Sequence, residues 1–439
     1  MDTNGPTLEP GGEAFTSSAR LPFLASIRQN FAWSFLGNVV FAGSQWGVLV
    51  VLAKLGSVEM VGQYGFGVAL TGPVFMLANM YLGVVLATDP RGEGQFATYS
   101  GARSVTTLVA SVAILGFALL SHWGSATTAV VLAIAAAKVL DSFSDILYGL
   151  FQRREAIDRI GKSMLLRGVL SLCAAAVAVR FAPSALAASL AVVAMGAVVL
   201  WLFDIATGAA LLGSRRALAP RVQATPIFRM LRAALPLGIV AMLMSLNTNI
   251  PRYFLEHERG AKDLGIFVGL AYISTAANLV VGSLGTAVIT RLSTLYANGE
   301  FSSFKQAVRL LVLFGTAVGV LEVTVAVLAG GPLLHLLYRA EYVAHKTAFV
   351  VAMFAAGIWH VSAFFGYATT AARQFAAQIP LWLLITASAA VASAWMIPSW
   401  GILGATWALV ASAVVQLFAY GWTYTRLFPS KRAGNGASE

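Results

Sequence analysis

Long apolar segments separated by short polar breaks run through this chain from Phe31 to Arg426. Each is about 20 residues long, which is the length a helix needs to cross a hydrocarbon core of about 30 Å, whereas the strands of a membrane barrel are about half that length. The pattern predicts twelve spanning helices, at residues 30–54, 62–87, 103–121, 126–151, 163–182, 184–213, 231–255, 263–290, 306–329, 346–369, 378–397 and 401–425. We therefore expect an all-α polytopic membrane protein.

Composition supports the same class. Hydrophobic residues make up 58% of the 439 residues and charged residues only 11%, whereas about a quarter of a soluble chain is charged. The net charge of +11 would suit a nucleic-acid partner, but the basic residues lie in short loops between the apolar segments, where they are typical of membrane topology. Nucleic acid is not expected as a partner.

The distribution of Lys and Arg predicts the orientation. With twelve crossings both ends lie on one side, and an N-terminus inside places about 21 Lys and Arg in inside segments and about 7 outside. Arg103 and Arg167 are counted among the inside residues. The first 20 residues contain no apolar segment, so we expect the first span to direct insertion. Both termini are predicted to be cytoplasmic.

A break rich in arginine and proline, residues 214–235, lies at the middle of the chain. It divides an N-lobe (30–213) from a C-lobe (236–426), with tails at 1–29 and 427–439. The stretch from Gly37 to Gly62 can be aligned with that from Gly238 to Gly265, which indicates a weak parallel repeat related by an axis along the membrane normal. We expect two six-helix lobes around a central cavity.

A stripe of polar residues crosses the fourth predicted span: Lys138, Asp141, Asp145, Tyr148 and Gln152. At about 100° per residue they share one face of a helix. Ionisable groups are costly in a bilayer, at about 2.5 to 3.5 kcal/mol each, so the stripe should face a protein or water-filled interior. Two interpretations stay open, namely a transport site, or a Lys138–Asp141 pair that only packs helix against helix with Asp145 near the membrane surface.

Other polar residues inside the spans extend this picture. Asn38 and Gln45 share a face of the first helix, and Arg252 follows Pro251 on a face that also carries Ser245, Thr248 and Asn249. For the uncharged residues, hydrogen bonding between helices is the alternative role, and for Arg252 it is snorkelling to the headgroups. Single ionisable residues lie inside three further spans, at Asp204, Glu322 and His360.

The chain lacks the motifs of several catalytic classes. It contains no Gly-x-x-x-x-Gly-Lys-Ser/Thr phosphate loop, and its five histidines have no metal-type spacing. No predicted loop exceeds about 25 residues, which is too short for a domain that holds a sugar donor. We expect a transporter rather than an enzyme, without a metal or cofactor except for a coupling ion, proton or sodium.

Several residues of the chain resemble those of bacterial polysaccharide flippases of the multidrug/oligosaccharidyl-lipid/polysaccharide exporter (MOP) superfamily. The resemblance is carried by Phe31-x-Trp33-x-x-x-Gly37-Asn38, Gln45-Trp46, Ala53-Lys54-Leu55-Gly56, Val61-Gly62-Gln63-Tyr64, Ala69, Pro73, Thr88-Asp89, Asp141-x-x-Ser144-Asp145-x-x-x-Gly149-x-x-Gln152, Pro251-Arg252-Tyr253 and Leu264-Gly265. It implies two six-helix lobes and alternating access. Related peptidoglycan-precursor flippases usually have fourteen helices, which disfavours their substrate here.

The resemblance implies a cargo, an undecaprenyl-diphosphate-linked oligosaccharide moved from the cytoplasmic to the periplasmic leaflet for O-antigen or exopolysaccharide synthesis. Such a cargo needs cations for the diphosphate and polar groups for the sugars. The candidate substrate-binding residues are Lys54, Lys138, Arg252, Arg291, Asn38 and Gln45. The candidate ion-coupling residues, for a proton or sodium, are Asp141, Asp145, Asp204 and Glu322. Consumption of the product outside is the alternative driving force.

A cation-coupled multidrug exporter of the same superfamily is the alternative, although the first span offers Asn38 and Gln45 and no carboxylate to bind an organic cation. A scaffold without transport activity would not need ionisable residues inside its spans. The expected partners are the lipid-linked oligosaccharide and membrane lipids, with polysaccharide polymerase machinery a further candidate.

Overall fold

Helices form all the regular structure in the residues that the computed structural model describes, which are 17–89, 96–121, 123–374 and 378–428. The N-terminal half contains α1 (Ser17–Leu55), α2 (Val58–Asn79), α3 (Leu82–Thr88), α4 (Phe96–Leu120), α5 (Ser125–Arg153), α6 (Ile157–Phe181), α7 (Ala185–Val199), η2 (Leu200–Asp204) and α8 (Ile205–Leu212). The short helix η3 (Arg215–Leu218) leads to α9 (Ala224–Tyr272), α10 (Thr275–Ala297), α11 (Phe301–Leu337), α12 (Ala340–Val343), α13 (Lys346–Ala371) and α14 (Gln378–Thr425).

These helices give the twelve membrane crossings expected from the sequence. Ten described helical segments are long and apolar enough to span a bilayer, and α5 is a further crossing whose middle carries Lys138, Asp141 and Asp145. Two long helices bend at a glycine with positive φ, Gly260 (80°) in α9 and Gly401 (54°) in α14, a conformation that residues with a side chain rarely adopt. α14 therefore crosses twice, and the part of α9 after Gly260 continues into α10 as one crossing.

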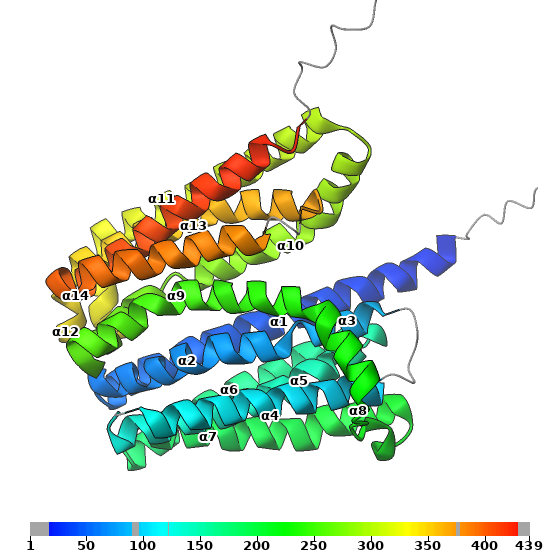
Figure 1. The fold of residues 1–439 in the computed structure, drawn as a ribbon, viewed down its shortest axis with the longest axis horizontal. Coiled ribbons are helices and arrows are strands. Elements are labelled where there is room, and N and C mark those ends of the chain that lie inside the picture. The colour runs from blue at the N-terminus through cyan, green and yellow to red at the C-terminus, as the bar shows by residue number, and fades with distance from the viewer. Residues whose placement is uncertain (1–16, 90–95, 122, 375–377, 429–439) are drawn as a thin grey trace, which may run out of the picture.

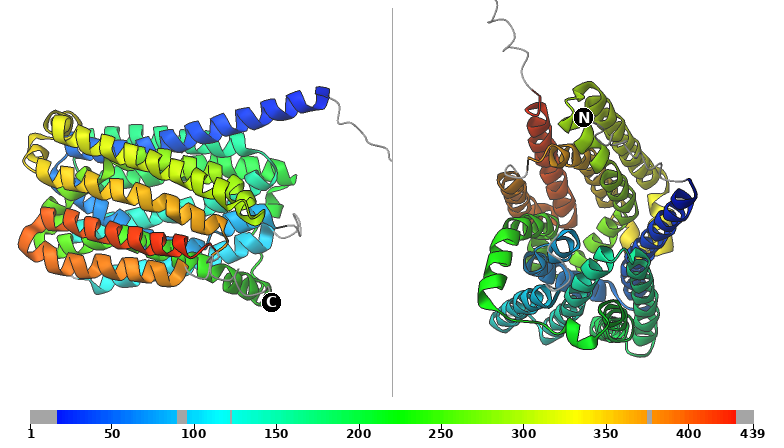
Figure 2. Two further views of the ribbon diagram at one scale, coloured as in Figure 1. Left: turned by 90° about the horizontal axis from the view of Figure 1, so that it is seen from above. Right: turned by 90° about the vertical axis from the view of Figure 1, so that its right-hand side faces the viewer.

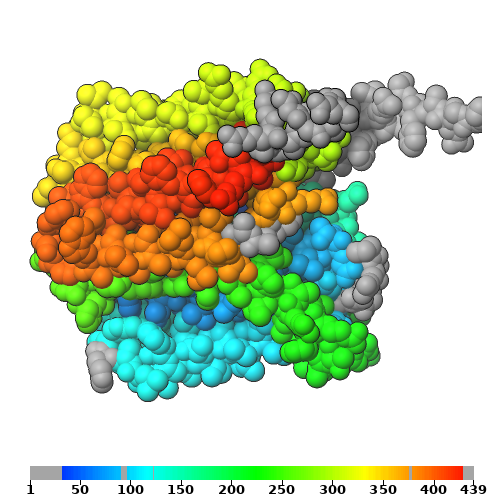
Figure 3. Space-filling model, turned by 45° about the horizontal axis from the view of Figure 1, so that its top comes forward, coloured from blue at the N-terminus to red at the C-terminus, as the bar shows by residue number. Residues whose placement is uncertain are grey.

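The helices form two lobes that run along a common direction (Figures 1 and 2). The N-lobe comprises α1 to α8 and the C-lobe comprises α9 to α14. In the space-filling view, α11 in yellow and α14 in orange and red form the visible face of the C-lobe, and α4 in cyan lies on that of the N-lobe, with green residues between them (Figure 3). Large apolar side chains are exposed over much of the surface, for example Leu119 (74%), Leu328 (77%) and Phe418 (73%), as expected where lipid is the solvent.

The first residues of α1 and the last of α14 lie at the same end of the molecule (Figure 1), as an even number of crossings requires. The segment predicted as a linker, 214–235, contains η3 and the first turns of α9. It is held to the N-lobe because Arg221 N donates to Ala97 O at 2.8 Å and Ile227 is buried against α3, α4 and α5 residues. Residues 1–16 and 429–439, in the predicted tails, lie outside the described residues.

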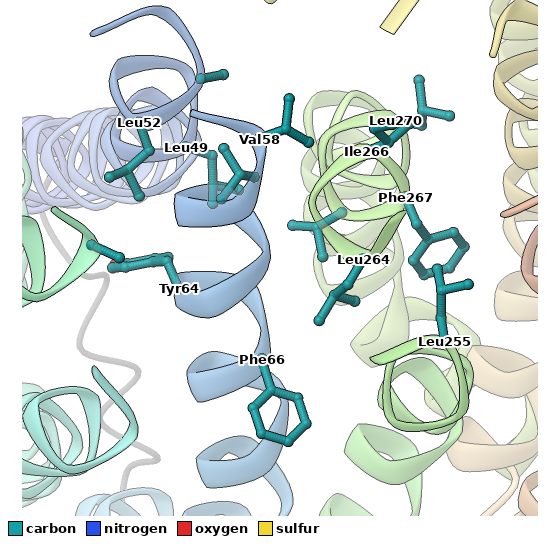
Figure 4. Close-up of a cluster of buried hydrophobic side chains, with 14 of the residues drawn as sticks. Leu49, Leu52, Val58, Tyr64, Phe66, Leu255, Leu264, Ile266, Phe267 and Leu270 are labelled. Carbon is teal, nitrogen blue, oxygen red and sulfur yellow. The ribbon is translucent and has the colours of Figure 1, made fainter. Parts of the chain in front are cut away.

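The lobes meet along α2 and α9, where the apolar core is continuous across the boundary (Figure 4). Small residues let the two backbones approach closely. A Cβ atom on Gly62 would lie 1.8 Å from Ala261 O, and one on Gly265 would lie 2.0 Å from Val58 O. Gly62 and Gly265 are the two glycines that the sequence alignment of the halves made equivalent, and a repeat related by an axis along the membrane normal brings such positions together.

Tyrosines strengthen the contact between the lobes at the end away from the termini. Trp46 Nε1 of α1 donates to Tyr338 Oη at 2.9 Å, and Tyr338 Oη donates to Gly269 O at 2.9 Å. The ring of Tyr342 stacks on that of Tyr338, with 4.6 Å between the centroids. Burial raises the pKa of the Tyr342 hydroxyl, which keeps it a donor to Gly265 O at 3.4 Å.

Candidate functional site

The N-lobe encloses a cavity of about 200 Å³ between α1, α2, α5, α6 and α7. Two of the predicted residues of the polar stripe, Lys138 and Asp141, line it, and Gln45 of α1 lines it as well. A third charge comes from Arg167 of α6, which was counted from the sequence among the inside residues. The lining therefore contains two cations and one carboxylate.

The carboxylate of Asp141 links the two cations. Its Oδ2 lies 3.3 Å from Lys138 Nζ, and its Oδ1 lies 3.1 Å from Arg167 Nη2. The side chain of Arg167 is 8% exposed, while those of Lys138 and Asp141 are about one-third exposed. The i, i+3 pair is present, and a cavity lies in front of it.

Asp204 lies behind this cavity, in the interior of the N-lobe. It is fully buried and accepts a hydrogen bond from Ser144 Oγ at 2.7 Å, and Ser144 Oγ in turn accepts one from Arg167 Nη1 at 3.1 Å. Asp204 is the last residue of η2, a π-helical turn. Such turns add a residue to a helix and often re-aim a functional side chain, and here the turn occurs where Asp204 meets α5.

Asp145, the third charge of the stripe, belongs to another cluster. Its Oδ2 lies 2.5 Å from Nη2 of Arg103, whose side chain is fully buried. Arg103 also donates to Asn79 Oδ1, which Ser142 Oγ contacts at 2.9 Å. This cluster connects α4 and α5 to the end of α2. The chain breaks there between α2 and α3, because Met80 and Tyr81 both have a left-handed backbone conformation.

The C-lobe encloses a cavity of about 390 Å³ lined by α9, α10, α13 and α14. Arg252, which the sequence places on the polar face of the seventh span, lines this cavity within the C-lobe, and its guanidinium lies 5.7 Å from the ring centroid of Tyr272. Arg252 Nε is buried without a hydrogen-bond partner among the described residues. Among those residues the lining contains no Asp or Glu.

Amide and hydroxyl groups complete the C-lobe lining. Asn247, Asn278 and Gln416 line the cavity together with Ser412 and Trp359. Ser412 Oγ donates to Asn247 Oδ1 at 2.6 Å. Gln416 is 2% exposed, and its Oε1 has no partner within the described part of the chain. The cavity thus presents an unpaired acceptor and an unpaired cationic donor, which suit a ligand with hydroxyl and anionic groups.

Tyr272 lines both cavities. It is the last residue of α9, and the helix is interrupted between Tyr272 and Thr275 before α10 begins. Broken helices at membrane depth are found where they line a cavity. The charged cavity of the N-lobe and that of the C-lobe therefore share Tyr272 as a lining residue.

Glu322 lies in the C-lobe but outside the cavity lining. Its Oε2 lies 3.4 Å from Nδ1 of His360, which is fully buried. The other ring nitrogen of His360 lies 3.0 Å from Asn278 Oδ1. Glu322 is thus connected to the cavity through His360 and Asn278.

Three predicted substrate residues lie outside both cavities. Lys54 is at the end of α1, where its Nζ donates to His335 O at 2.9 Å and so joins the lobes. Asn38 Nδ2 donates to Ser34 O at 2.8 Å within α1, and Arg291 is exposed on α10. The sequence identified Lys54 and Arg291 as cation candidates and placed Asn38 on the face that carries Gln45, but it could not say which of these side chains reach a cavity.

Sequence reasoning missed Arg103 and Arg167, which it counted as residues of cytoplasmic segments. In the structure they are buried inside α4 and α6, and removing them from the count leaves the direction of the charge bias unchanged. A signal was present for Arg167, which lies ten residues into its helix, about 15 Å at 1.5 Å per residue, between apolar neighbours.

Solved structures with the same architecture are transporters. An inward-facing multidrug resistance MATE family transporter of the MOP superfamily is 15% identical, with a TM-score of 0.71 over 88% of this chain and 94% of that one. An outward-facing MATE family transporter is 14% identical, with a TM-score of 0.61 over 92% and 95%. The protein thus has the fold of a MOP-superfamily transporter.

Sequence comparison identifies the family. The capsular polysaccharide biosynthesis protein CapF of Staphylococcus aureus is 25% identical over 404 residues, which cover 91% of this chain and all of that protein. A family described as polysaccharide biosynthesis protein matches residues 27–295, more than half of the chain. With twelve crossings, buried charge in both lobes and this match, the chain belongs to the polysaccharide biosynthesis protein family and is a multi-pass membrane protein with a transporter fold.

Proposed function

We propose that the protein flips an undecaprenyl-diphosphate-linked oligosaccharide from the cytoplasmic to the outer leaflet of a bacterial inner membrane by alternating access. The observation that carries the proposal is the surplus of positive charge in both cavities, which meet at Tyr272. The N-lobe lining holds Lys138 and Arg167 against Asp141 alone. The C-lobe lining holds Arg252 and no carboxylate among the described residues.

A diphosphate is the part of such a lipid that cannot enter hydrocarbon unaided. Charge-assisted hydrogen bonds from arginine and lysine are the usual means by which proteins hold phosphate groups. The unpaired Nε of Arg252 is available for this purpose, and a cation in each lobe allows the two phosphates to be held from both sides. The barrier to crossing falls because the charge stays solvated by protein.

The remaining C-lobe groups suit the sugar next to the diphosphate. Gln416 Oε1 needs a donor, which a sugar hydroxyl supplies, and the Trp359 ring offers an apolar face with a polar edge. The family name and the name of CapF support a polysaccharide precursor as the cargo class.

The contact between the lobes at Trp46, Tyr338 and Tyr342 supports a conformation closed at the end away from the termini. The higher TM-score with the inward-facing MATE structure agrees with this. If the termini are cytoplasmic, as the charge bias predicts, the closed end is periplasmic. Cysteines placed at the exposed residues Arg159 and Lys262 in a Cys173-free chain should then react from opposite sides with an impermeant thiol reagent, and labelling of both from outside would contradict this orientation.

The alternative, export of organic cations, is less well supported. A cation-binding cavity needs carboxylates or aromatic faces without competing cations, whereas Arg252 is placed over the ring of Tyr272 at 5.7 Å. Its positive charge would repel a cationic drug from that ring.

The experiment compares the two cargoes directly. The full-length protein in proteoliposomes is given a polyprenyl-diphosphate-linked oligosaccharide, whose outward movement is measured by capture with an impermeant lectin, and in parallel ethidium. We expect movement of the glycolipid above that in protein-free vesicles and no transport of ethidium. Transport of ethidium without movement of the glycolipid would overturn the proposal in favour of the exporter.

A further inference from the structure

A groove lies on the surface of the molecule between α2, α4 and α9, where the N-lobe meets the C-lobe. Its volume is about 480 Å³, and α2 lies between the other two helices (Figure 1). Apart from Tyr253, Glu256 and His257, the side chains that line it are apolar, and one of them, Phe117, is 55% exposed. Because lipid is the solvent of these spanning helices, a hydrocarbon chain suits this groove.

The polar group in the middle of the groove already has a partner within the protein. Pro73 lies inside α2 and has no N–H, so the carbonyl of Ala69, four residues earlier, has no helical donor. Tyr253 Oη of α9 donates to this carbonyl at 2.5 Å. The hydroxyl of Tyr253 is therefore used between the helices, and the inner part of the groove offers a ligand only apolar contacts.

The groove has the length of one leaflet. On α9 it extends from Leu246 to His257, which is about 16 Å at 1.5 Å per residue, or about half of a hydrocarbon core of about 30 Å. Its polar end lies near Gly260, where α9 bends, and Trp123, in the connection between α4 and α5, lies at the same end. This end is away from the termini (Figure 1). The groove therefore runs from the headgroup region on that side towards the middle of the membrane.

Glu256 supplies a negative charge at the polar end of the groove. It is half-buried, and its carboxylate forms no hydrogen bond or ion pair with another described residue, while the next residue, His257, is exposed. A half-buried carboxylate without a partner favours a ligand cation and repels an anion. The ring of Trp123 packs against those of Phe66 and Phe117, with 4.9 and 5.6 Å between the centroids, and indoles are common at the headgroup level of a bilayer.

We propose that the groove binds one phospholipid with a primary ammonium headgroup, namely phosphatidylethanolamine. An acyl chain of the lipid occupies the apolar lining, its ammonium group pairs with Glu256, and His257 supplies a donor for its phosphate. Phosphatidylglycerol would bring a phosphate to Glu256 without a cation, and a choline headgroup has no N–H to donate to the carboxylate. Because α2 and α4 belong to the N-lobe and α9 to the C-lobe, the lipid contacts both lobes. This inference is independent of the proposed cargo.

The headgroup assignment is tested by native mass spectrometry of the full-length protein, released from nanodiscs that hold equal amounts of dioleoyl phosphatidylethanolamine, phosphatidylglycerol and phosphatidylcholine. We expect one copy of phosphatidylethanolamine to be retained in preference to the other two lipids. Glu256→Gln should lower this preference about tenfold, the effect of losing one hydrogen bond to a charged group. Glu258→Gln is the matched control, because Glu258 is exposed on the same helix outside the groove lining, and it should keep the preference.

The chain assignment is tested by filling the groove. Ala113→Trp places a large side chain in the groove lining and should lower retention of phosphatidylethanolamine, whereas Val112→Trp, at a residue of α4 that is 61% exposed outside the lining, should not. A ligand that binds the folded protein also raises its melting temperature. Phosphatidylethanolamine added in detergent should therefore stabilise the unchanged protein and Glu258→Gln, but not Glu256→Gln, and melting without added lipid shows whether each variant folds.

The proposal is overturned if the three lipids are retained equally, or if Glu256→Gln keeps both the preference and the stabilisation by phosphatidylethanolamine. It is also overturned if the protein retains undecaprenyl phosphate, added to the same nanodiscs, in preference to phosphatidylethanolamine, because the groove would then hold the chain of the cargo. Since Glu256→Gln changes neither the size of the side chain nor the groove lining, the headgroup result stands even where Ala113→Trp fails to fold.

Discussion

Arginines inside the membrane-spanning helices have contrasting surroundings, and the contrast separates structural from transport roles. Arg103 contacts both Asn79 and Asp145 and is fully buried. Both arginines have a buried Nε without a partner in the described residues, but Arg252 lies along a cavity wall and forms no ion pair with a described carboxylate. A buried charge without compensation is costly, so the first arrangement suits a helix-packing role and the second suits a ligand.

Arg252→Lys tests this assignment, because lysine keeps the charge but loses the planar fork that grips phosphate. We expect glycolipid movement to fall about tenfold or more, since a hydrogen bond to a charged group contributes about 1.5 to 3 kcal/mol. Arg252→Ala should reduce it further. Arg259→Lys, at an exposed residue that bonds Pro398 O, is the control. Full activity of both Arg252 variants at normal protein level would remove the residue from the site.

Lys138→Gln isolates the contribution of Lys138 to ligand binding. Because Asp141 keeps Arg167 at 3.1 Å, this variant should fold normally while moving less glycolipid. Asp141→Asn, in contrast, leaves both cations without their carboxylate and should destabilise the protein by about 1 to 3 kcal/mol, less than for a fully buried pair. Melting temperatures in detergent distinguish the two. If Lys138→Gln melts normally and transports normally, the stripe is only structural.

At the scale of elements, the spans could be predicted because hydrophobicity is a property of consecutive residues and a bilayer demands about 20 of them. The site could not be predicted to the same extent, because its pairs join distant segments. Asp141 of α5 meets Arg167 of α6, and Arg103 of α4 meets Asn79 at the end of α2. Gln45, Lys138, Asp141 and Arg252 were candidates because polar residues inside a span can be recognised in the sequence, and the structure places them on cavity linings. Lys54 was a candidate as well, but it lies at a helix end and contacts the other lobe.

The close approach of α2 and α9 gives a prediction at this scale. Gly62→Ala would place a Cβ atom 1.8 Å from Ala261 O, so the backbones must separate. We expect a loss of about 1 to 3 kcal/mol, the usual cost of overpacking, seen as a lower melting temperature in detergent. Gly43→Ala in α1, where a Cβ meets nothing within 4 Å, should not lower it. Equal melting temperatures for the two variants would show that this contact does not depend on glycine.

For the whole molecule, alternating access requires that the contact between the lobes at Trp46, Tyr338 and Tyr342 opens during each cycle. The same end holds two further contacts between the lobes, Lys54 Nζ to His335 O at 2.9 Å and Arg339 Nη2 to Lys54 O at 3.2 Å. Each is a hydrogen bond from a solvent-accessible side chain, which can break and re-form at little cost. An apolar seal alone would be harder to reopen.

A cross-link across this end should therefore stop transport. Cysteines at Lys54 and Arg339, in a chain whose Cys173 is replaced by serine, would be joined by a short bifunctional thiol reagent, which fixes the N-lobe to the C-lobe. We expect glycolipid movement to cease on cross-linking and to return when a cleavable reagent is reduced. The control joins Lys262 to Glu341, an ion pair of 3.6 Å within the C-lobe, and should leave transport intact. Transport that continues in the cross-linked Lys54–Arg339 protein would mean that the lobes need not part at this end, and that the cargo crosses by another route.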